Sequence, residues 1–297
     1  MNYDRLEIFG RQRMSWQTYC EVDTINRVVH SKHLTICGKK DGLGCQLNAK
    51  YSGIAFCYYS QDHRYVHTPF TSVSHGYRKA ERVKELNEFF GIPDDRRTYP
   101  PNTSRKWVGE VFGDPNKWYT DDVLNLIRSY YWSTPKPPSC EQDIVIHIRR
   151  GDVSWNLASG EPNKLCRKWF YFDNKYYNKI IPWIANRYPY YTIAIHTEYE
   201  RGLDPNFSQF EPIMRGWPNS LKNRITWKIG TDYDPNCKHS LFSVFHDMVT
   251  AKVLVGSISG LSYTTSLLNP NVVYYKKGGH SSIHRGQNIG LNRWIHY

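Results

Sequence analysis

Two adjacent arginines, Arg149 and Arg150, follow directly after Ile144–Ile148, an apolar run rich in β-branched residues. A run of this length and composition predicts a strand that is buried on both faces of a parallel sheet. Ligands of such sheets bind in the crevice outside the carboxyl ends of the strands. Each guanidinium group is a permanent cation with a planar set of donors that matches a diphosphate. We therefore predict that both arginines bind a diphosphate and stabilise the negative charge that develops on it.

The neighbouring residues extend this pattern to His-Ile-Arg-Arg-Gly-Asp, from His147 to Asp152. The alternative is that the arginines face solvent and that the Arg-Gly-Asp triplet is an adhesion sequence or a chance occurrence. A strand that ends in the longer pattern favours ligand binding. Asp152 would then act as a general base or hold the arginines by salt bridges.

A glycine-rich turn occurs near the start of the chain. The run His33–Cys37 predicts a short strand, Gly38–Leu47 a turn, and the apolar positions of Leu47–Tyr59 a helix. Gly42 and Gly44 would let the backbone approach a ligand closely, and the helix N-terminus could receive an anion. In isolation, an ordinary strand-to-helix turn explains the same residues.

Strands and helices alternate after the Pro-rich segment Ser133–Ser139, which we predict to be a linker. This alternation predicts a parallel, doubly wound α/β sheet. We expect its strands at Asp143–Arg149, Tyr190–His196, Ile225–Ile229, Lys252–Val255 and Val272–Tyr275, with helices near 168–187, 238–250 and 260–268. Before the linker, we expect a strand at Arg64–Phe70, loops over 91–120, and helices at Tyr77–Phe90 and Asp121–Trp132, the latter with Thr120 as N-cap. The domains would be residues 1–132 and 140–297, with the tail returning to the first domain.

The composition is that of a folded protein, with 40% hydrophobic and 15% aromatic residues. Because no apolar run approaches the roughly 20 residues that span a bilayer, and no signal peptide is visible, we expect a soluble, cytoplasmic protein. The net charge of +12 fits an anionic substrate or nucleic acid, but the basic residues are dispersed and no nucleic-acid motif accompanies them. The seven cysteines lack C-x-x-C spacing, which favours reduced thiols over a zinc site or a disulfide framework.

Three motifs together resemble those of the fucosyltransferases. Gly42–Leu47 is similar to the N-terminal glycine loop of the core α1,6-fucosyltransferases. His147–Asp152 is similar to the arginine motif shared by the α1,6-, α1,2- and protein O-fucosyltransferases, although Gly151 stands where the core family has threonine. His246–Ser262 resembles their last motif, in which a helix leads into an apolar strand and a serine-rich loop. No stem or SH3-like domain is visible, which leaves the acceptor and the linkage open.

This resemblance implies a GT-B fold, in which two Rossmann-like domains with parallel sheets face a cleft. It implies GDP-fucose as the donor substrate, with no cofactor and no metal, because arginines replace the cation at the diphosphate. The partners would be the nucleotide sugar and a glycan or glycoprotein acceptor, without nucleic acid or membrane. Motif positions assign donor binding to Gly42, Gly44, Gln46, Asn48, His147, Arg167, His246, Ser257, Ser259 and Ser262. For His246, a core histidine on an amphipathic helix is an equally good interpretation.

An inverting transfer also needs a general base for the acceptor hydroxyl. The core α1,6-fucosyltransferases carry a glutamate after the arginine motif, and this resemblance places the base at Glu161, with Asp152 and Asp41 as alternatives. Asp232-Tyr-Asp234 has the spacing of a metal-binding carboxylate pair, but the Pro and Asn that follow favour a turn.

Three functions therefore fit the sequence. The first is a metal-independent, inverting fucosyltransferase. The second is a glycosyltransferase that uses another nucleotide sugar, such as a UDP-linked one. The third is a non-catalytic basic protein that binds carbohydrate or nucleic acid, because the 23 tyrosines and 10 tryptophans offer rings for stacking.

Overall fold

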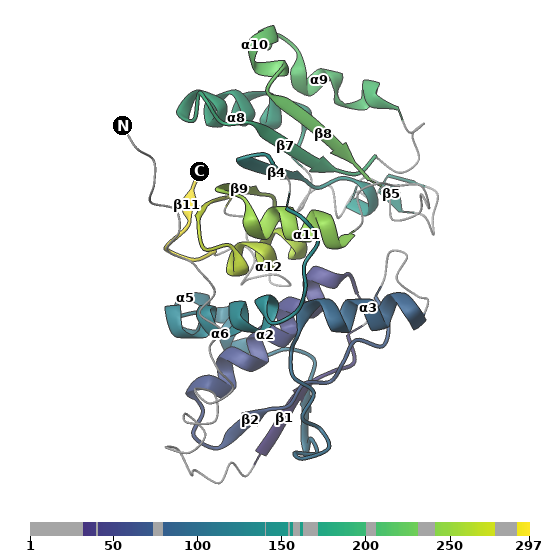
Figure 1. Cartoon of the computed structure of the whole chain (residues 1–297), viewed down its shortest axis with the longest axis vertical. Coiled ribbons are helices and arrows are strands. Elements are labelled where there is room, and N and C mark those ends of the chain that lie inside the picture. Colours follow the sequence, from purple (N-terminus) through teal and green to yellow (C-terminus); the bar gives the residue numbers. More distant parts are fainter. Residues whose placement is uncertain are drawn as a thin grey trace.

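The computed structural model shows an α/β protein with two parallel sheets (Figure 1). It describes residues 32–39, 41–73, 80–139, 141–153, 155–156, 161–162, 172–199, 206–230, 241–276 and 290–297, and leaves out the side chains of residues 80–82, 152, 155–156 and 161–162. The predicted fold class, α/β with two parallel sheets, is confirmed by the strand pairing. None of the helices in these ranges is long and apolar enough to cross a bilayer.

The first sheet has the strand order β2-β1-β3, and its strands are parallel. The strands are β1 (Lys32–Ile36), β2 (His63–Tyr65) and β3 (Thr103–Arg105). The helix after β1, α2 (Leu43–Tyr59), begins at Leu43 rather than at the predicted Leu47, because Gly42 is its N-cap. Most of α2 is buried, which explains why apolar residues surround this helix instead of forming one stripe.

The remaining elements of the first half are α3 (Ala80–Phe90), α4 (Gly109–Gly113), α5 (Pro115–Trp118) and α6 (Asp121–Trp132). The predicted loop over residues 91–120 is wrong where β3, α4 and α5 occur, since elements of three to five residues carry too little periodicity to be recognised. The predicted strand Arg64–Phe70 already ends at Tyr65, and Pro69 in the segment after it has no N–H for a ladder bond. Thr120 is the N-cap of α6, but its hydroxyl contacts that of Tyr59 instead of capping the helix.

The second sheet has six parallel strands in the order β11-β10-β9-β4-β7-β8. They are β4 (Ile144–Ile148), β7 (Ile193–Thr197), β8 (Ile225–Ile229), β9 (Val253–Gly256), β10 (Val272–Tyr275) and β11 (Ile295–His296). The first five were predicted within a few residues, and the two-residue β11 was not. After β4 the chain adds β7 and β8 on one side, and then crosses to add β9 and β10 on the other. This reversal between β4 and β9 is the topological switch point, where ligands of open α/β sheets bind.

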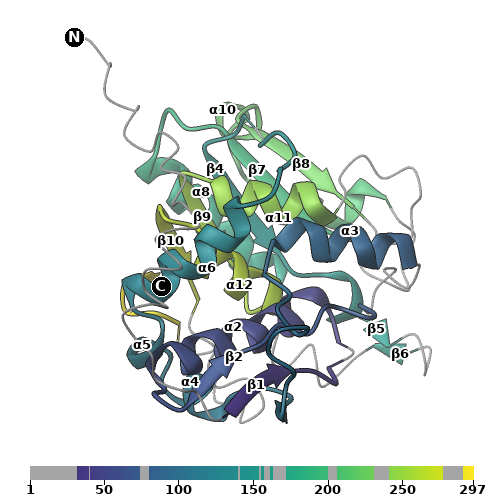
Figure 2. The ribbon, with the colours of Figure 1, turned by 60° about the horizontal axis from the view of Figure 1, so that its bottom comes forward.

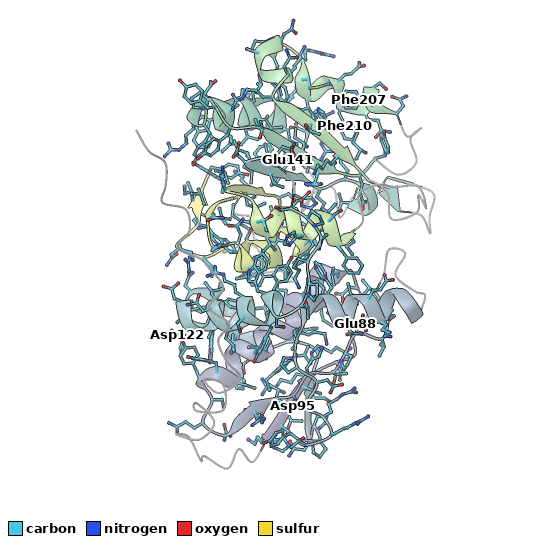
Figure 3. All side chains as sticks on the ribbon, viewed as in Figure 1. Glu88, Asp95, Asp122, Glu141, Phe207 and Phe210 are labelled. Carbon is cyan, nitrogen blue, oxygen red and sulfur yellow. The ribbon has the colours of Figure 1, made fainter. Side chains whose placement is uncertain are left out.

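Helices cover both faces of this sheet. Ile144, Ile146 and Ile148 share one core with α8 (Asn174–Arg187), whereas Val145 packs in a second core with α11 (Leu241–Thr250) and α12 (Gly260–Leu268). The short elements are η1 (Gly151–Val153), η2 (Phe207–Phe210), α9 (Glu211–Met214), α10 (Asn219–Lys222) and the hairpin of β5 (Trp155–Asn156) with β6 (Glu161–Pro162). On β8, the edge strand, the ring of Trp227 stacks on that of Phe210, with centroids 5.1 Å apart. Phe210 is labelled in Figure 3.

The two halves meet through helices, with α2 and α6 against α12 (Figures 1 and 2). Gly44 of α2 lies so close to Gly260 of α12 that an added Cβ would be 2.2 Å from the Gly260 carbonyl carbon. The Thr264 hydroxyl donates to the Gly44 carbonyl at 2.9 Å. The tail also joins the first half, since Asn292 N–H donates to the Asn116 side chain at 2.6 Å. Gly44 is therefore required for helix packing, whereas we had expected it to admit a ligand.

Candidate functional site

Three polar side chains meet at the switch point, one from β4 and two from the loop and helix that follow β9. The Nδ1 atom of His147 lies 2.6 Å from the Ser262 hydroxyl and 3.1 Å from the Ser257 hydroxyl. The Ser257 N–H donates to the Ser262 hydroxyl at 3.1 Å, so the proton of that hydroxyl can be donated to His147. Burial, followed by the positive charge of Arg149, lowers the pKa of His147 to about 3, and its imidazole is therefore neutral at pH 7.

The two arginines of the motif have different surroundings. Side chains alternate along an extended chain, so Arg149 continues the face of His147 and Arg150 the opposite face. Arg149 is half-buried, and its charge acts on His147. Arg150 is only 2% exposed and donates to the Asn174 side chain at 2.9 Å and to the Arg149 carbonyl at 3.1 Å. Its guanidinium also lies 5.3 Å from the centre of the Tyr177 ring, so Arg150 ties the loop after β4 to the first turn of α8.

Gly151 fixes the path of the chain after these arginines. Its φ is +69°, a conformation that residues with a Cβ rarely adopt. A Cβ added there would lie 1.9 Å from the Glu198 carboxylate, which follows β7. Glu198 was missed in the sequence, because a single carboxylate after a strand forms no recognisable motif.

Replacing Gly151 by alanine should therefore lower the free energy of unfolding by about 1–3 kcal/mol, from the left-handed backbone and the crowding against Glu198. Urea denaturation measures this loss. Gly109→Ala is the matched control, because nothing lies within 4 Å of a Cβ at Gly109, and we expect a change within about 0.5 kcal/mol. If Gly151→Ala unfolds like the unmodified protein, Glu198 does not restrain this loop.

Three other predicted donor-binding residues lie within the described ranges: Ser259, Gln46 and Asn48. Ser259 is the N-cap of α12, and its hydroxyl accepts the Leu261 N–H at 3.2 Å. Gln46 donates to the carbonyls of Asp41 and Ser72 at 2.7 and 2.9 Å, and so holds the first loop to the segment after β2. The amide of Asn48 is buried without a hydrogen-bond partner among the described residues.

His246 lies apart from this group. It is buried, and its Nδ1 atom is 2.9 Å from the Tyr131 hydroxyl of α6, with its ring edge-on to that of Trp132. These contacts are those of a core histidine between α11 and α6.

The structure describes only part of the candidates for the general base, and neither the predicted donor residue Arg167 nor the Asp232–Asp234 pair. Glu161 and Asp152 are described for their backbone alone, and Arg167, Asp232 and Asp234 lie outside the described residues. Asp41 is described, and its carboxylate pairs with Lys39 at 2.8 Å. The assignment of the base to Glu161 therefore stays a prediction.

A charged cluster lies beside His147 and was not recognised in the sequence. His196 on β7 pairs in register with His147, and its Nε2 atom is 3.1 Å from the Asp247 carboxylate. Lys228 of β8 lies 3.0 Å from the same carboxylate oxygen. Burial alone would raise the pKa of Asp247, but the bonds from His196 and Lys228 outweigh it and lower this pKa. A buried carboxylate of α11 thus joins β7 and β8, next to the strand that carries His147.

The chain resembles known proteins in structure but not in sequence. No protein-family model matches the chain, and no curated protein matches it. Solved structures that resemble it include E. coli heptosyltransferase WaaC with ADP, at 12% identity over 95% of this chain and 72% of that chain, with a TM-score of 0.36. WaaC with ADP-2-deoxy-2-fluoro heptose resembles it at 10% identity over 89% of this chain and 92% of that chain, also with a TM-score of 0.36. Similarity at this level supports no functional conclusion.

The arrangement at the switch point is suited to an anion. It combines the fixed charge of Arg149, the neutral imidazole of His147, the hydroxyls of Ser257 and Ser262, and the N-terminus of α12. In the described ranges, no group of three or more His, Cys, Asp or Glu residues is placed to hold a metal ion. The cysteines there, Cys37, Cys45 and Cys57, are free thiols.

Proposed function

We propose that this chain is a glycosyltransferase that transfers fucose from GDP-fucose to a glycan hydroxyl, with inversion and without a metal ion. The observation that carries the proposal is the meeting of the three motifs that resemble those of the fucosyltransferases. Gly44 of the first motif contacts Gly260 of the last, and His147 of the second contacts Ser262 of the last. Contacts between residues more than 100 positions apart thus bring the three motifs together near the carboxyl edge of the second sheet, which supports the proposal.

In this proposal the diphosphate of the donor lies against Arg149 and the N-terminus of α12. Negative charge grows on the diphosphate as its bond to the sugar breaks, and a preorganised cation lowers the energy of that transition state. The serine hydroxyls hold Nδ1 of neutral His147, which leaves its Nε2–H as a hydrogen-bond donor at the same edge. Arg150 acts indirectly, since it holds the loop that carries Arg149. Glu161 would accept the proton of the acceptor hydroxyl.

Nucleotide binding tests this proposal directly. We expect GDP and GDP-fucose to raise the melting temperature, with or without EDTA. At 100 times its dissociation constant, each ligand should add about 2.7 kcal/mol to the free energy of unfolding. Release of GDP in the presence of glycan acceptors then measures transfer. A shift with UDP alone would replace the fucose donor by a UDP-linked sugar. A response to oligonucleotides alone would replace the enzyme by a binding protein, and no response to any nucleotide would contradict both enzyme functions.

A further inference from the structure

A cavity of about 150 Å³ lies at the carboxyl edge of the first sheet, and none of the serines and arginines described above lines it. The end of β1 contributes Cys37 and Lys39, the segment after β2 contributes Thr68–Thr71, and α2 contributes Gln46 and Lys50. This volume is too small for a nucleotide, whose sites typically measure about 300–1,000 Å³, but it holds a carboxylate or a phosphate group.

The distinguishing feature of the cavity is the buried ammonium group of Lys50. Lys50 is 4% exposed, and its Nζ atom donates to the carbonyl oxygens of Ile36 (3.5 Å) and Thr68 and lies 4.8 Å from the centre of the Phe70 ring. These contacts occupy two of its three donors. No carboxylate within the described residues forms an ion pair with it. Burying an unpaired charge is costly, so the cavity favours an anion as its occupant.

The carboxylates in the loops next to this edge are already paired. Asp41 pairs with Lys39 at 2.8 Å, and Asp94 pairs with Arg96 at 2.7 Å. Asp95, labelled in the lower half of Figure 3, pairs with Arg64 at 3.3 Å. None of them neutralises Lys50, and the cavity keeps a positive charge.

An exposed aromatic ring lies beside the cavity. Lys39, which lines the cavity, places its ammonium 5.5 Å from the centre of the Trp107 ring, and Trp107 is 51% exposed. Trp107 follows β3 and so belongs to the same edge of the sheet. An indole has a flat apolar face on which the apolar face of a sugar ring can pack.

The cavity is also close to the candidate donor site along α2. Gln46 lines the cavity, and Gly44, two residues earlier on the same turn, contacts α12 at Gly260. A group bound in the cavity therefore lies on the first half and next to the helix whose N-terminus faces the proposed donor.

We propose that this cavity binds the anionic group of an acidic sugar of the acceptor, a carboxylate, phosphate or sulfate, while the sugar ring packs on Trp107. The assignment of the bound sugar to the acceptor rests on the proposed function, whereas anion binding by Lys50 does not. Lys50 pairs with the anion, and neutral sugars leave Lys50 unpaired.

Calorimetry with the whole protein tests the anion site with glucuronate, glucose 6-phosphate, glucose 6-sulfate and glucose. We expect the acidic sugars to bind and glucose not to bind. Lys50→Met should weaken acidic-sugar binding at least tenfold, and Lys84→Met, which removes the same charge at an exposed position on α3, should change it less than twofold. Trp107→Ala should weaken binding of glucuronate but not of inorganic phosphate. Equal binding of glucose, or unchanged binding in Lys50→Met, would overturn the proposal.

A pH series on the unmodified protein provides a test without a core substitution. Burial and the charge of Arg96 lower the pKa of Lys50 to about 8, partly offset by Cys37, so glucuronate affinity should fall about tenfold per pH unit above pH 8. The other groups around Lys50 are Lys39 and His67, and burial keeps His67 neutral in this range. Cys37→Ser should keep the fall in affinity but move it to lower pH, because Cys37 raises the pKa of Lys50. A flat profile would contradict a role for Lys50. GDP binding, measured in parallel, separates the proposals: glucuronate binding without GDP binding would leave the anion site and remove the transferase.

Discussion

Replacing Arg149 by alanine should lower kcat/KM for sugar transfer about 10²- to 10³-fold and leave the free energy of unfolding within about 1 kcal/mol. Arg149 is half-buried at the crevice, on the face of the sheet that carries His147, and its charge adds to the effect of burial in lowering the pKa of His147. Its proposed role is to stabilise the departing diphosphate, and this interaction grows in the transition state. Steady-state kinetics and urea denaturation on the same samples measure both quantities.

Arg150→Ala is the matched comparison, because it removes the same side chain from the adjacent position. Arg150 is buried on Asn174 and Tyr177, so its removal leaves the Asn174 side chain without a charged partner and should cost about 2–3 kcal/mol of stability. Combining Arg150→Ala with Asn174→Ala should cost less than the two separate losses together, since the residues share one hydrogen bond. If Arg149→Ala keeps its transfer rate in a folded protein, the proposed diphosphate site is wrong.

The contrast between these arginines shows what the sequence could not provide. The run Ile144–Ile148 predicted β4 because four β-branched apolar residues around His147, flanked by polar residues, leave little choice of structure. The motif after it predicted that a charged group lies at the carboxyl edge. It could not assign each arginine to a face of the sheet, because Asn174 and Tyr177, which bind Arg150, come from a helix more than 20 residues away.

The same limit applies to Gly44 and Lys50 on α2. Gly44 was expected to admit a ligand, and its neighbour is instead the backbone of α12, more than 200 residues further along the chain. Lys50 drew no attention in the sequence, because a lysine in a predicted helix normally faces solvent. Its burial follows from the position of α2 between the first sheet and α12, which depends on both halves of the protein.

Lowering the pH from 6.5 to 4.5 should destabilise the protein by about 5 kcal/mol, a large part of the 5–15 kcal/mol that is typical of folded proteins. Burial lowers the pKa of His67 and of His147 to about 3, and also lowers those of His196 and His246. In the unfolded chain these histidines take up protons near pH 6.5. The unfolded state therefore binds more protons than the folded state below pH 6.5, and stability falls as the pH falls.

His67 and His147 alone should each contribute about 1.4 kcal/mol per pH unit in this window. Asp247 does not contribute to it, because its pKa is lowered from 3.8 and its stabilising effect is lost only at more acidic pH. Urea denaturation between pH 7.5 and 4.5 measures the slope, and His67→Gln should reduce it by about 1.4 kcal/mol per pH unit. An unchanged slope in His67→Gln would mean that His67 takes up its proton without unfolding, which its burial beside the cation of Lys50 opposes.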